Sequence, residues 1–302
     1  MEPFGLSDPP LRHYRTTVWD SARWDGFVRR ADDVLICTPY KSGTTWMQMI
    51  CALLIFRTPD LPLPLAEISP WMDLRAAPAD QVHGVYGAQT HRRFIKTHTP
   101  LDGLPWDARA KHICVLRDPR DVFISMSNQM KNNNPEAVAL FMADMDPDAP
   151  EPPEEHNALF CYWLSTASFA WERDGAPYWS ALRHGATYWQ HRAQDGILMV
   201  HYADLKADLE GQMRRVAAYL GIEIDEALWP DLVHAAGFAQ MKARADKTAP
   251  DTNFNMWKDN AAFFHKGVSR QWEGVLTDDS LALLDEALER YPSDYVRWLL
   301  RA

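Results

Sequence analysis

The chain has 302 residues, of which 47% are hydrophobic and 24% are charged, and its formal net charge is -10. This composition is that of a folded globular protein, and the length suffices for one large domain or two small ones. The negative charge argues against nonspecific nucleic-acid binding, and no apolar run approaches the roughly 20 residues of a membrane span.

The four cysteines occur singly in apolar runs, without the C-x-x-C spacing of many zinc sites: Cys37, Cys51, Cys114 and Cys161. We interpret them as buried free thiols in a reducing compartment. The first segment, Met1–Thr17, lacks the apolar region of a secretory signal. The sequence therefore predicts a cytoplasmic protein without a bound metal.

Short apolar runs alternate along the chain with segments of helical periodicity. Runs typical of buried strands occur at Val34–Cys37, Arg93–Thr97, Lys111–Arg117 and Ile197–Tyr202. Helical patterns occur at Thr44–Phe56, Arg120–Lys131, Asn157–Glu172, Tyr178–His191, Leu205–Leu220, Glu226–His234 and Asp278–Glu289. The alternation predicts an α/β fold, with a mostly parallel central sheet flanked by helices, in a single domain over residues 1–302.

Two long segments lack a clear periodicity. Residues 132–155 are rich in Pro, Asp and Glu, and we expect an acidic surface insertion there. Residues 247–272 form a second irregular stretch near the C-terminus. Because unstructured loops of that length are uncommon in compact domains and are often functional, we expect this stretch to be a lid-like loop.

The strongest functional signal follows the first strand-like run, where the sequence reads Lys41, Ser42, Gly43, Thr44, Thr45, Trp46. A strand, a tight loop and a helix N-terminus together bind phosphate or sulfate groups, because backbone N–H groups and the helix dipole point at the anion. Lys41 adds a full charge, and the hydroxyl groups add donors. The alternative is an ordinary turn in which Ser and Thr only cap the helix.

A second cationic group is placed where another predicted strand ends. Arg117 ends the run at 111–117, at the sheet edge where α/β proteins bind ligands, and Ser125 follows eight residues later. A guanidinium matches a phosphate through two parallel hydrogen bonds. The alternative is a surface ion pair between Arg117 and Asp121.

Two further segments place polar groups near the expected site. His98 follows the run at 93–97 and is positioned to act as a base, although a single histidine is more often structural. Residues 263–272 combine aromatic and cationic side chains with Gly267, which lets backbone approach an anion closely. The alternative for this segment is a solvated basic patch.

Together these motifs resemble those of a known family. Lys-Ser-Gly-Thr-Thr-Trp at 41–46, Lys-Thr-His at 96–98, Arg-Asp-Pro-Arg-Asp-Val at 117–122 with Ser125, and Lys-Gly at 266–267 occur in the order found in cytosolic-type sulfotransferases. The resemblance runs from about residue 30 to 291. It implies transfer of a sulfuryl group from 3'-phosphoadenosine 5'-phosphosulfate (PAPS) to a hydroxyl or amine, which leaves adenosine 3',5'-bisphosphate (PAP) and needs no metal.

The resemblance also implies roles for individual residues. Lys41 would stabilise the leaving phosphate oxygen, and His98 would be the general base. The implied donor-binding residues are Lys41, Ser42, Gly43, Thr44 and Thr45 at the 5'-phosphosulfate; Trp46, Tyr202 and Phe238 at the adenine; and Arg117, Ser125, Phe264, His265, Lys266 and Gly267 at the 3'-phosphate.

The sequence departs from the family pattern in two places. Pro39 and Tyr40 stand in the reverse of the usual order, which changes how the strand enters the loop. His265 stands where the family has arginine, and Arg270 is a candidate replacement for that charge.

Two alternative functions are weighed against this identification. A P-loop nucleotide kinase would need its lysine after the last glycine, whereas Lys41 precedes Gly43. A nucleotide-binding protein without catalysis stays open, although Lys41 and His98 argue against it.

The expected acceptor is a small molecule, apolar or aromatic in character. Its binding pocket should lie beside His98, lined by the loops at Leu61–Met72, Val82–Gln89 and Met142–Met145, where aromatic and Met side chains are plentiful. The sequence does not define the oligomeric state.

Overall fold

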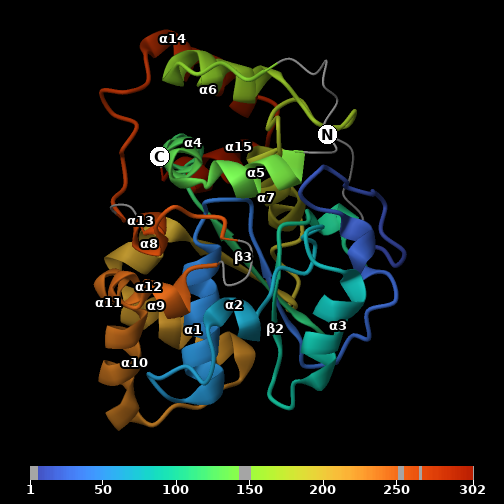
Figure 1. Ribbon diagram of the computed structural model, residues 1–302, viewed down its shortest axis with the longest axis vertical. Helices are drawn as coiled ribbons and strands as arrows, with labels where there is room; N and C mark the ends of the chain where they lie inside the picture. The colour runs from blue at the N-terminus through green and yellow to red at the C-terminus, as the bar shows by residue number, and fades with distance from the viewer. Residues whose placement is uncertain (1–5, 143–150, 251–254, 265–266, 302) are drawn as a thin grey trace.

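The apolar runs pair side by side as a parallel sheet in the computed structural model, which describes residues 6–142, 151–250, 255–264 and 267–301 (Figure 1). Within these ranges the strand order is β2-β1-β3-β4, and all neighbours are parallel. The strands are β1 (Val34–Cys37), β2 (Phe94–Thr97), β3 (Lys111–Leu116) and β4 (Ile197–His201). The predicted parallel α/β sheet is therefore confirmed, and each strand end lies within one residue of its prediction.

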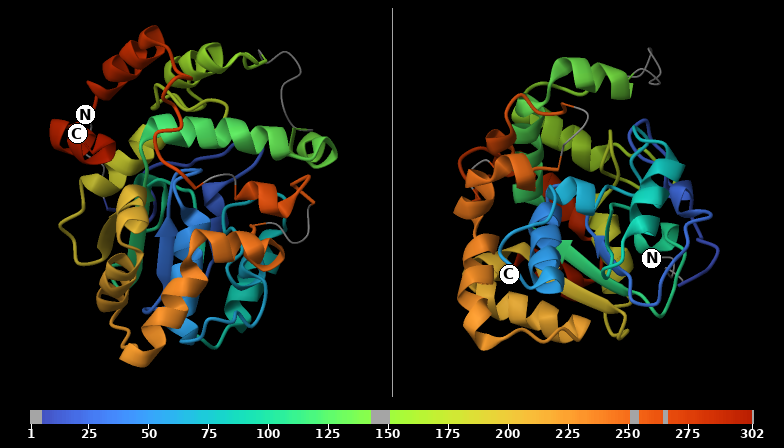
Figure 2. Two further views of the ribbon diagram at one scale, coloured as in Figure 1. Left: turned by 90° about the vertical axis from the view of Figure 1, so that its left-hand side faces the viewer. Right: turned by 60° about the horizontal axis from the view of Figure 1, so that its bottom comes forward.

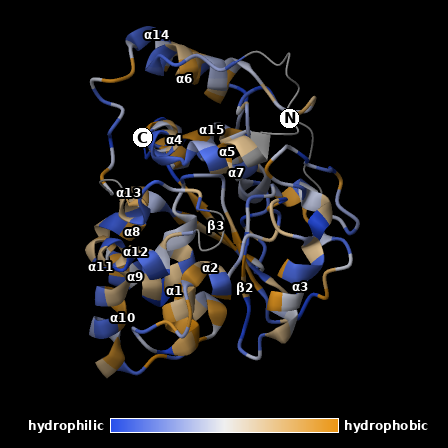
Figure 3. Ribbon diagram, in the orientation of Figure 1, coloured by the Kyte–Doolittle hydropathy of each residue, from blue (hydrophilic) through white to orange (hydrophobic). Residues whose placement is uncertain are grey.

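Alternate residues of each strand enter two hydrophobic cores on opposite faces of the sheet. Leu35 and Cys37 of β1 join the core that includes α7, whereas Val34 and Ile36 join the core that includes α1. The hydrophobic colours of β2 and β3 in Figure 3 reflect this double burial. Strands covered on both faces need apolar residues at every position, which explains why these strands read as continuous apolar runs.

The helices follow the strands in the order expected for an α/β fold. They are α1 (Thr44–Phe56), α2 (Leu65–Ile68), α3 (Ala79–Ala88), α4 (Pro119–Asn132), α5 (Pro135–Met142), α6 (His156–Ser165), α7 (Ala181–Trp189), α8 (Tyr202–Ala207), α9 (Leu209–Leu220), α10 (Trp229–Ala236), α11 (Phe238–Ala243), α12 (Ala245–Thr248), α13 (Asn260–Phe263), α14 (Asp278–Leu288) and α15 (Ser293–Leu300). Short 3-10 turns occur at Ser21–Trp24, Leu101–Gly103 and Glu226–Leu228. The strand–loop–helix unit β1–α1 matches the prediction at every boundary.

The predicted helix at 157–172 was too long, because α6 ends at Ser165. The following residues turn back onto α6, where the N–H of Gly175 donates to the Trp163 carbonyl at 2.7 Å and that of Ala176 to the Thr166 carbonyl at 3.0 Å. The next helix starts at Ala181 instead of 178, because Ser180 caps it by accepting from the N–H of Arg183. Tertiary packing thus overrode the helical pattern.

The predicted helix at 205–220 is two helices, α8 and α9, which meet at Asp208. The Asp208 carboxylate accepts from the N–H of Gly211 at 2.9 Å and so caps a new helix inside the predicted one.

Both segments predicted to be irregular are partly helical. Residues 135–142 form α5, whose first turn begins at a proline, a favoured residue at that position. Residues 143–150 lie outside the described ranges. Near the C-terminus, α13 is capped by Asp259, which accepts from the N–H of Ala261 at 2.8 Å.

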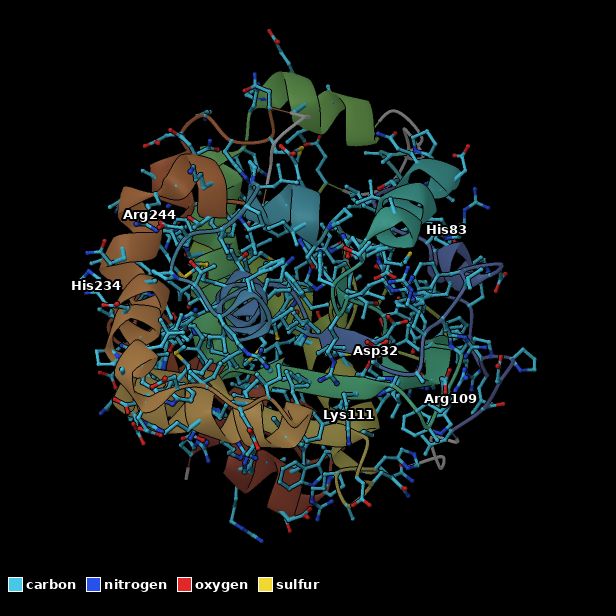
Figure 4. All side chains as sticks on the ribbon, turned by 90° about the horizontal axis from the view of Figure 1, so that it is seen from below. Asp32, His83, Arg109, Lys111, His234 and Arg244 are labelled. Atoms are coloured by element: carbon cyan, nitrogen blue, oxygen red, sulfur yellow. The ribbon has the colours of Figure 1, made fainter. Side chains whose placement is uncertain are left out.

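Residues 255–264 and 267–272 lie against α4 above the carboxyl ends of the strands. The N–H of Lys258 donates to the Asn132 carbonyl at 2.8 Å, and the Asn132 side-chain amide donates to the Asp259 carbonyl at 2.8 Å. Figure 2 (left) shows α4 and α5 crossing above the strands, with the orange segment of α13 beside them. The opposite edge, where Asp32 and Lys111 lie, faces the viewer in Figure 4. The loops that carry the predicted functional residues therefore meet at the edge under α4.

Candidate anion-binding and catalytic site

The loop between β1 and α1 has two residues in the left-handed region, Lys41 with φ 58° and Gly43 with φ 109°. A Cβ atom on Gly43 would lie 3.0 Å from the ring of Tyr202, so a side chain at this position would be both strained in its backbone conformation and crowded by that ring. Thr44 begins α1, and Gly43 has no side chain to cap the first turn. The N–H groups of that turn are consequently open to an anion.

The hydroxyl groups of this loop are largely buried. Thr44 shares a hydrogen bond of 2.6 Å with Thr38 at the end of β1, and the Ser42 hydroxyl donates to the Tyr40 carbonyl at 3.3 Å. Thr45 is buried as well. These contacts hold the loop against the sheet and define its path into α1.

Tyr40, whose order with Pro39 departs from the family pattern, points into a group of aromatic side chains. Its hydroxyl accepts a hydrogen bond of 2.5 Å from Nε1 of Trp163, and its ring lies edge-on to that of Trp179 at 5.0 Å. The ring of Tyr178 also packs against that of Tyr40, at 5.4 Å. The departure thus places an aromatic residue next to the loop without preventing its left-handed turn at Lys41.

Lys41 lies under α4 and α13. Its ammonium donates to Oε1 of Gln129 at 2.6 Å and lies 4.3 Å above the ring of Phe263. Burial, and then the charges of Arg117 and Lys96, lower the pKa of Lys41 to about 7. A bound anion would reverse this effect, because opposite charge favours the ammonium form.

Arg117 lies just beyond β3, with its guanidinium 4.4 Å over the ring of Tyr202. One terminal nitrogen donates to the Val268 carbonyl at 3.1 Å and lies 3.7 Å from the Asp121 carboxylate. That carboxylate accepts from the N–H groups of residues 270–271. Nε of Arg117 is buried and has no hydrogen-bond partner among the described residues. A buried unpaired donor of this kind fits an anionic ligand.

The predicted adenine residues fall into two groups. Trp46 lies edge-on to Tyr202 at 5.3 Å, and its Nε1 donates to the Ala236 carbonyl at 2.8 Å, just before α11. Phe238, the first residue of α11, lies 6.1 Å from Phe264. The structure therefore brings aromatic rings from distant parts of the chain around the start of α1.

Gly267 also approaches Phe238 closely. It has φ 60°, and a Cβ atom there would lie 2.7 Å from the Phe238 ring. His265 and Lys266, which precede it, lie outside the described residues. Arg270 is the candidate replacement for the family arginine, but its side chain is 74% exposed and donates to Glu273 at 2.5 Å, so it is directed to solvent.

Ser125 lies on α4 and is half-buried. Within the described ranges no hydrogen bond joins it to Arg117, and its role as a ligand of the 3'-phosphate stays a prediction.

His98 is held in one tautomer by the end of β1. Its Nδ1 lies 2.7 Å from the Thr38 carbonyl, which can only accept, so Nδ1 carries the proton and Nε2 keeps a free lone pair. The ring lies between Trp71 at 4.7 Å and Trp179 at 5.5 Å. Burial, and then the charge of Lys96, hold the pKa of His98 well below its ordinary value. The side chain is therefore a neutral base at physiological pH.

Asp73, which the sequence reasoning did not single out, holds the backbone of His98. Its carboxylate accepts from the His98 N–H at 2.8 Å, the Thr97 hydroxyl at 2.7 Å, and Nε1 of Trp71 and Trp24 at 3.1 and 2.7 Å. Its signal in the sequence was weak, because the position lies in an irregular segment 25 residues before His98.

Lys96 belongs to the Lys-Thr-His motif, but the sequence reasoning gave it no role, although its spacing offered a signal. Successive strand residues alternate between faces, so Lys96 and His98 share a side. Lys96 is buried, its ammonium lies 5.0 Å over the Trp71 ring, and burial lowers its pKa to about 8. Two lysines and one arginine therefore concentrate positive charge at this edge of a chain whose net charge is negative.

The predicted acceptor loops are only partly those that surround His98. Trp71, from the predicted 61–72 loop, does contact His98. The segment 82–89 is not a loop but the greater part of α3, and its Tyr86 is buried with its hydroxyl on the Pro70 carbonyl. The residues 143–145 lie outside the described ranges. Tyr40, Tyr178 and Trp179 were not foreseen on this side.

Two further observations concern the described residues. They contain no group of three or more His, Cys, Asp or Glu side chains arranged to hold a metal ion. No helix among them is long and apolar enough to cross a membrane.

Comparisons with known proteins agree with this geometry. The family model for the sulfotransferase domain matches residues 31–295. A glycolipid sulfotransferase of Mycobacterium bovis is 36% identical over 307 residues, 94% of this chain and 93% of that protein. A glycolipid sulfotransferase of Mycobacterium tuberculosis is 36% identical over 306 residues, with the same two coverages.

A solved mouse sulfotransferase in complex with PAP has the same fold, with a TM-score of 0.71 and 23% identity over 92% of each chain. The identification from sequence motifs is confirmed, and the nucleotide-kinase alternative is not favoured. The chain belongs to the sulfotransferase family.

Proposed function

We propose that this sulfotransferase moves the sulfuryl group of PAPS to a hydroxyl of a glycolipid, with Lys41 and His98 as the catalytic side chains. The observation that carries the proposal is that a neutral His98, whose Nε2 has no hydrogen-bond partner among the described residues, lies at the same sheet edge as the cationic cradle, the loop and helix start at 41–46. A base and an anion site at the same sheet edge are what a transfer to a hydroxyl requires.

The residues present fit a donor with two anionic ends. The first turn of α1 and Lys41 would hold the phosphosulfate, and the unpaired Nε of Arg117 would meet the 3'-phosphate. Trp46 and Phe238 would hold the adenine. Ser125, His265 and Lys266 stay predicted ligands of the 3'-phosphate.

The chemistry needs positioning and charge stabilisation more than covalent catalysis. When bound, PAPS supplies a sulfuryl group on a phosphate leaving group. His98 takes the proton of the acceptor hydroxyl at Nε2 while the new O–S bond forms. Lys41 stabilises the negative charge on the phosphate oxygen that leaves sulfur. The low pKa of His98 favours the neutral form that this step requires.

A glycolipid acceptor is supported by two independent features. The two relatives at 36% identity are named glycolipid sulfotransferases. Large rings lie around His98: Trp71 and Trp179 contact it, and Tyr40 packs against Trp179, so the surroundings suit an acceptor with apolar parts. A lipid-linked sugar combines such parts with the hydroxyl that the reaction needs.

The test is sulfation of a panel of glycolipids, sterols and phenols by the purified chain with PAPS, followed by mass spectrometry of the products. We expect a sulfated glycolipid. His98→Asn should lower kcat by about 10²-fold or more, the usual contribution of a general base, while PAP binding persists. Lys41→Met should also lower kcat strongly.

Lys111→Met is the matched control for Lys41. Lys111 lies at the start of β3, on the opposite edge of the sheet, with its ammonium 4.9 Å over the Tyr219 ring. Its replacement should leave kcat unchanged. Turnover of phenols alone would contradict the glycolipid acceptor, and full activity of His98→Asn would contradict the catalytic assignment.

A further inference from the structure

His184, on α7, is a buried imidazole without a hydrogen-bond partner. Its side chain is 0% exposed, and neither Nδ1 nor Nε2 has a partner within the part of the chain that the structure describes. A buried polar group left unpaired costs about 1–3 kcal/mol, so native proteins nearly always pair such groups. The unpaired ring therefore points to a ligand that is not part of the chain.

The position of α7 places this ring on the catalytic edge of the sheet. Thr187 accepts from the Leu101 N–H at 3.0 Å, and the Tyr188 hydroxyl donates to the Thr99 carbonyl at 3.2 Å, so this turn of α7 lies level with the end of β2. The C-terminal end of α7 leads to the start of β4, so its N-terminal end points toward the carboxyl ends of the strands. His184 precedes Thr187 and Tyr188 by about one helical turn, and it therefore lies closer to that edge, where His98 is. His184 is also close enough for its charge to affect the pKa of His98.

A second unpaired group lies on the same side. The ring of Trp179 lies 5.5 Å from His98, and its Nε1 is buried without a partner among the described residues. His112, another buried histidine, is on the opposite edge, stacks on Trp106 at 4.9 Å and has the Gly196 carbonyl within 3.3 Å. The unpaired state of His184 is thus not shared by every buried histidine of the chain.

We propose that His184 binds the acceptor, with its two ring nitrogens on the hydroxyls that neighbour the one deprotonated by His98. A neutral imidazole offers one donor and one acceptor, which matches two adjacent sugar hydroxyls. The proposal rests on the glycolipid acceptor proposed above and deepens it. His184 would make the site select polyhydroxylated acceptors over simple alcohols, because an acceptor without these hydroxyls leaves the ring unpaired.

The test compares octyl β-glucoside with 1-octanol, which share an alkyl chain and differ in the sugar. In His184→Met, kcat/KM for the glucoside should fall about 10- to 100-fold, mainly through KM. The kcat/KM for 1-octanol should change less than about threefold. His184→Gln, which keeps a donor and an acceptor, should recover part of the loss.

Thermal unfolding separates this role from a structural one. His184→Met removes a buried unpaired polar group, so its melting temperature should equal or exceed that of the wild type. The control His112→Met should lower stability and leave the ratio of the two acceptors unchanged. Equal losses on glucoside and octanol, or no loss on either, would overturn the proposal.

The failure of the glycolipid assignment is a different result, namely a wild type that sulfates 2-naphthol but no glycoside. In that case calorimetry on the wild-type complex with PAP decides the role of His184. Tighter binding of octyl glucoside than of octanol, with the difference lost in His184→Met, would support it. Equal binding of the two compounds would refute it.

Discussion

Asp73→Asn is the sharpest test of how the structure positions the base. One carboxylate oxygen accepts from the His98 N–H, the Thr97 hydroxyl and Nε1 of Trp71, and the other accepts from Nε1 of Trp24. An asparagine oxygen can replace only one of these two oxygens. Its NH2 group would then face at least one donor, most simply that of Trp24.

The magnitude follows from this count of bonds. One buried donor pair left unsatisfied costs about 1–3 kcal/mol, and the three other bonds lose the extra strength of a charged acceptor. The loss is partly offset because the buried carboxylate is itself unfavourable, as its raised pKa indicates. We expect the free energy of unfolding to fall by about 2–4 kcal/mol.

The catalytic effect should appear in kcat. A shift of the His98 backbone misdirects Nε2, and a misplacement of about 1 Å can cost about 10²-fold in rate, so we expect kcat to fall about 10- to 100-fold. PAP affinity should change less than about threefold, since Asp73 makes no described contact with the loop at 41–46. The assays are steady-state sulfation and calorimetry with PAP, below the melting temperature of the variant.

Asp33→Asn is the matched control. Asp33 is buried at the opposite edge of the sheet and accepts from Arg93 at 2.6 and 2.5 Å. Its replacement should also lower stability, but without an effect on kcat of the folded fraction. A kcat of Asp73→Asn within about threefold of the wild type would refute a positioning role.

Three further predictions concern the donor site and pH. The pKa of His98 is far below 6.5, so the acid limb of kcat/KM should lie well below pH 6.5, and a limb at or above that value would contradict the neutral base. The pKa of Lys41 is lowered from 10.5 to about 7, so the free energy of unfolding should rise with pH between about 7 and 10.5, where the unfolded chain keeps a proton that the folded chain has released. PAP should bind with proton uptake above about pH 7, and calorimetry in buffers of different ionisation enthalpy should show this uptake in the wild type but not in Lys41→Met. Gly267→Ala should weaken PAP binding about tenfold or more, because the new Cβ atom would meet the Phe238 ring. The control Gly274→Ala, at a glycine with φ 72° and no atom within 4 Å of the new Cβ, should leave PAP affinity unchanged. Equal effects of the two substitutions would show that crowding against Phe238 does not matter for PAP binding.

The unit β1–α1 was predictable because its determinants are local. Four apolar residues, a Gly that adopts φ 109° and a helical pattern from Thr44 lie within one short stretch. The same holds for His98 and Arg117, each of which directly follows a strand. Parallel strands bring their carboxyl ends to one edge, so the sequence placed these residues in one neighbourhood.

Helix ends were less predictable where packing decided them. The pattern of α6 continues past Ser165, but Gly175 and Ala176 return to pair with Trp163 and Thr166. Such contacts form between residues that no local pattern connects, and they compete successfully with helix propensity.

The sequence by itself determined the fold class and the family, and it predicted the loop at 41–46 with Lys41 and the candidate base His98, because periodicity and turn chemistry depend on neighbouring residues. Only the tertiary structure showed Asp73 holding the His98 backbone, Arg117 over Tyr202, and the unpaired ring of His184 on α7. The contacts of Asp73 with His98 and of Arg117 with Tyr202 join residues 25 and 85 positions apart, and they depend on how the strands and helices pack together. A single sequence lists the side chains, but packing decides which of them remain unpaired at the site.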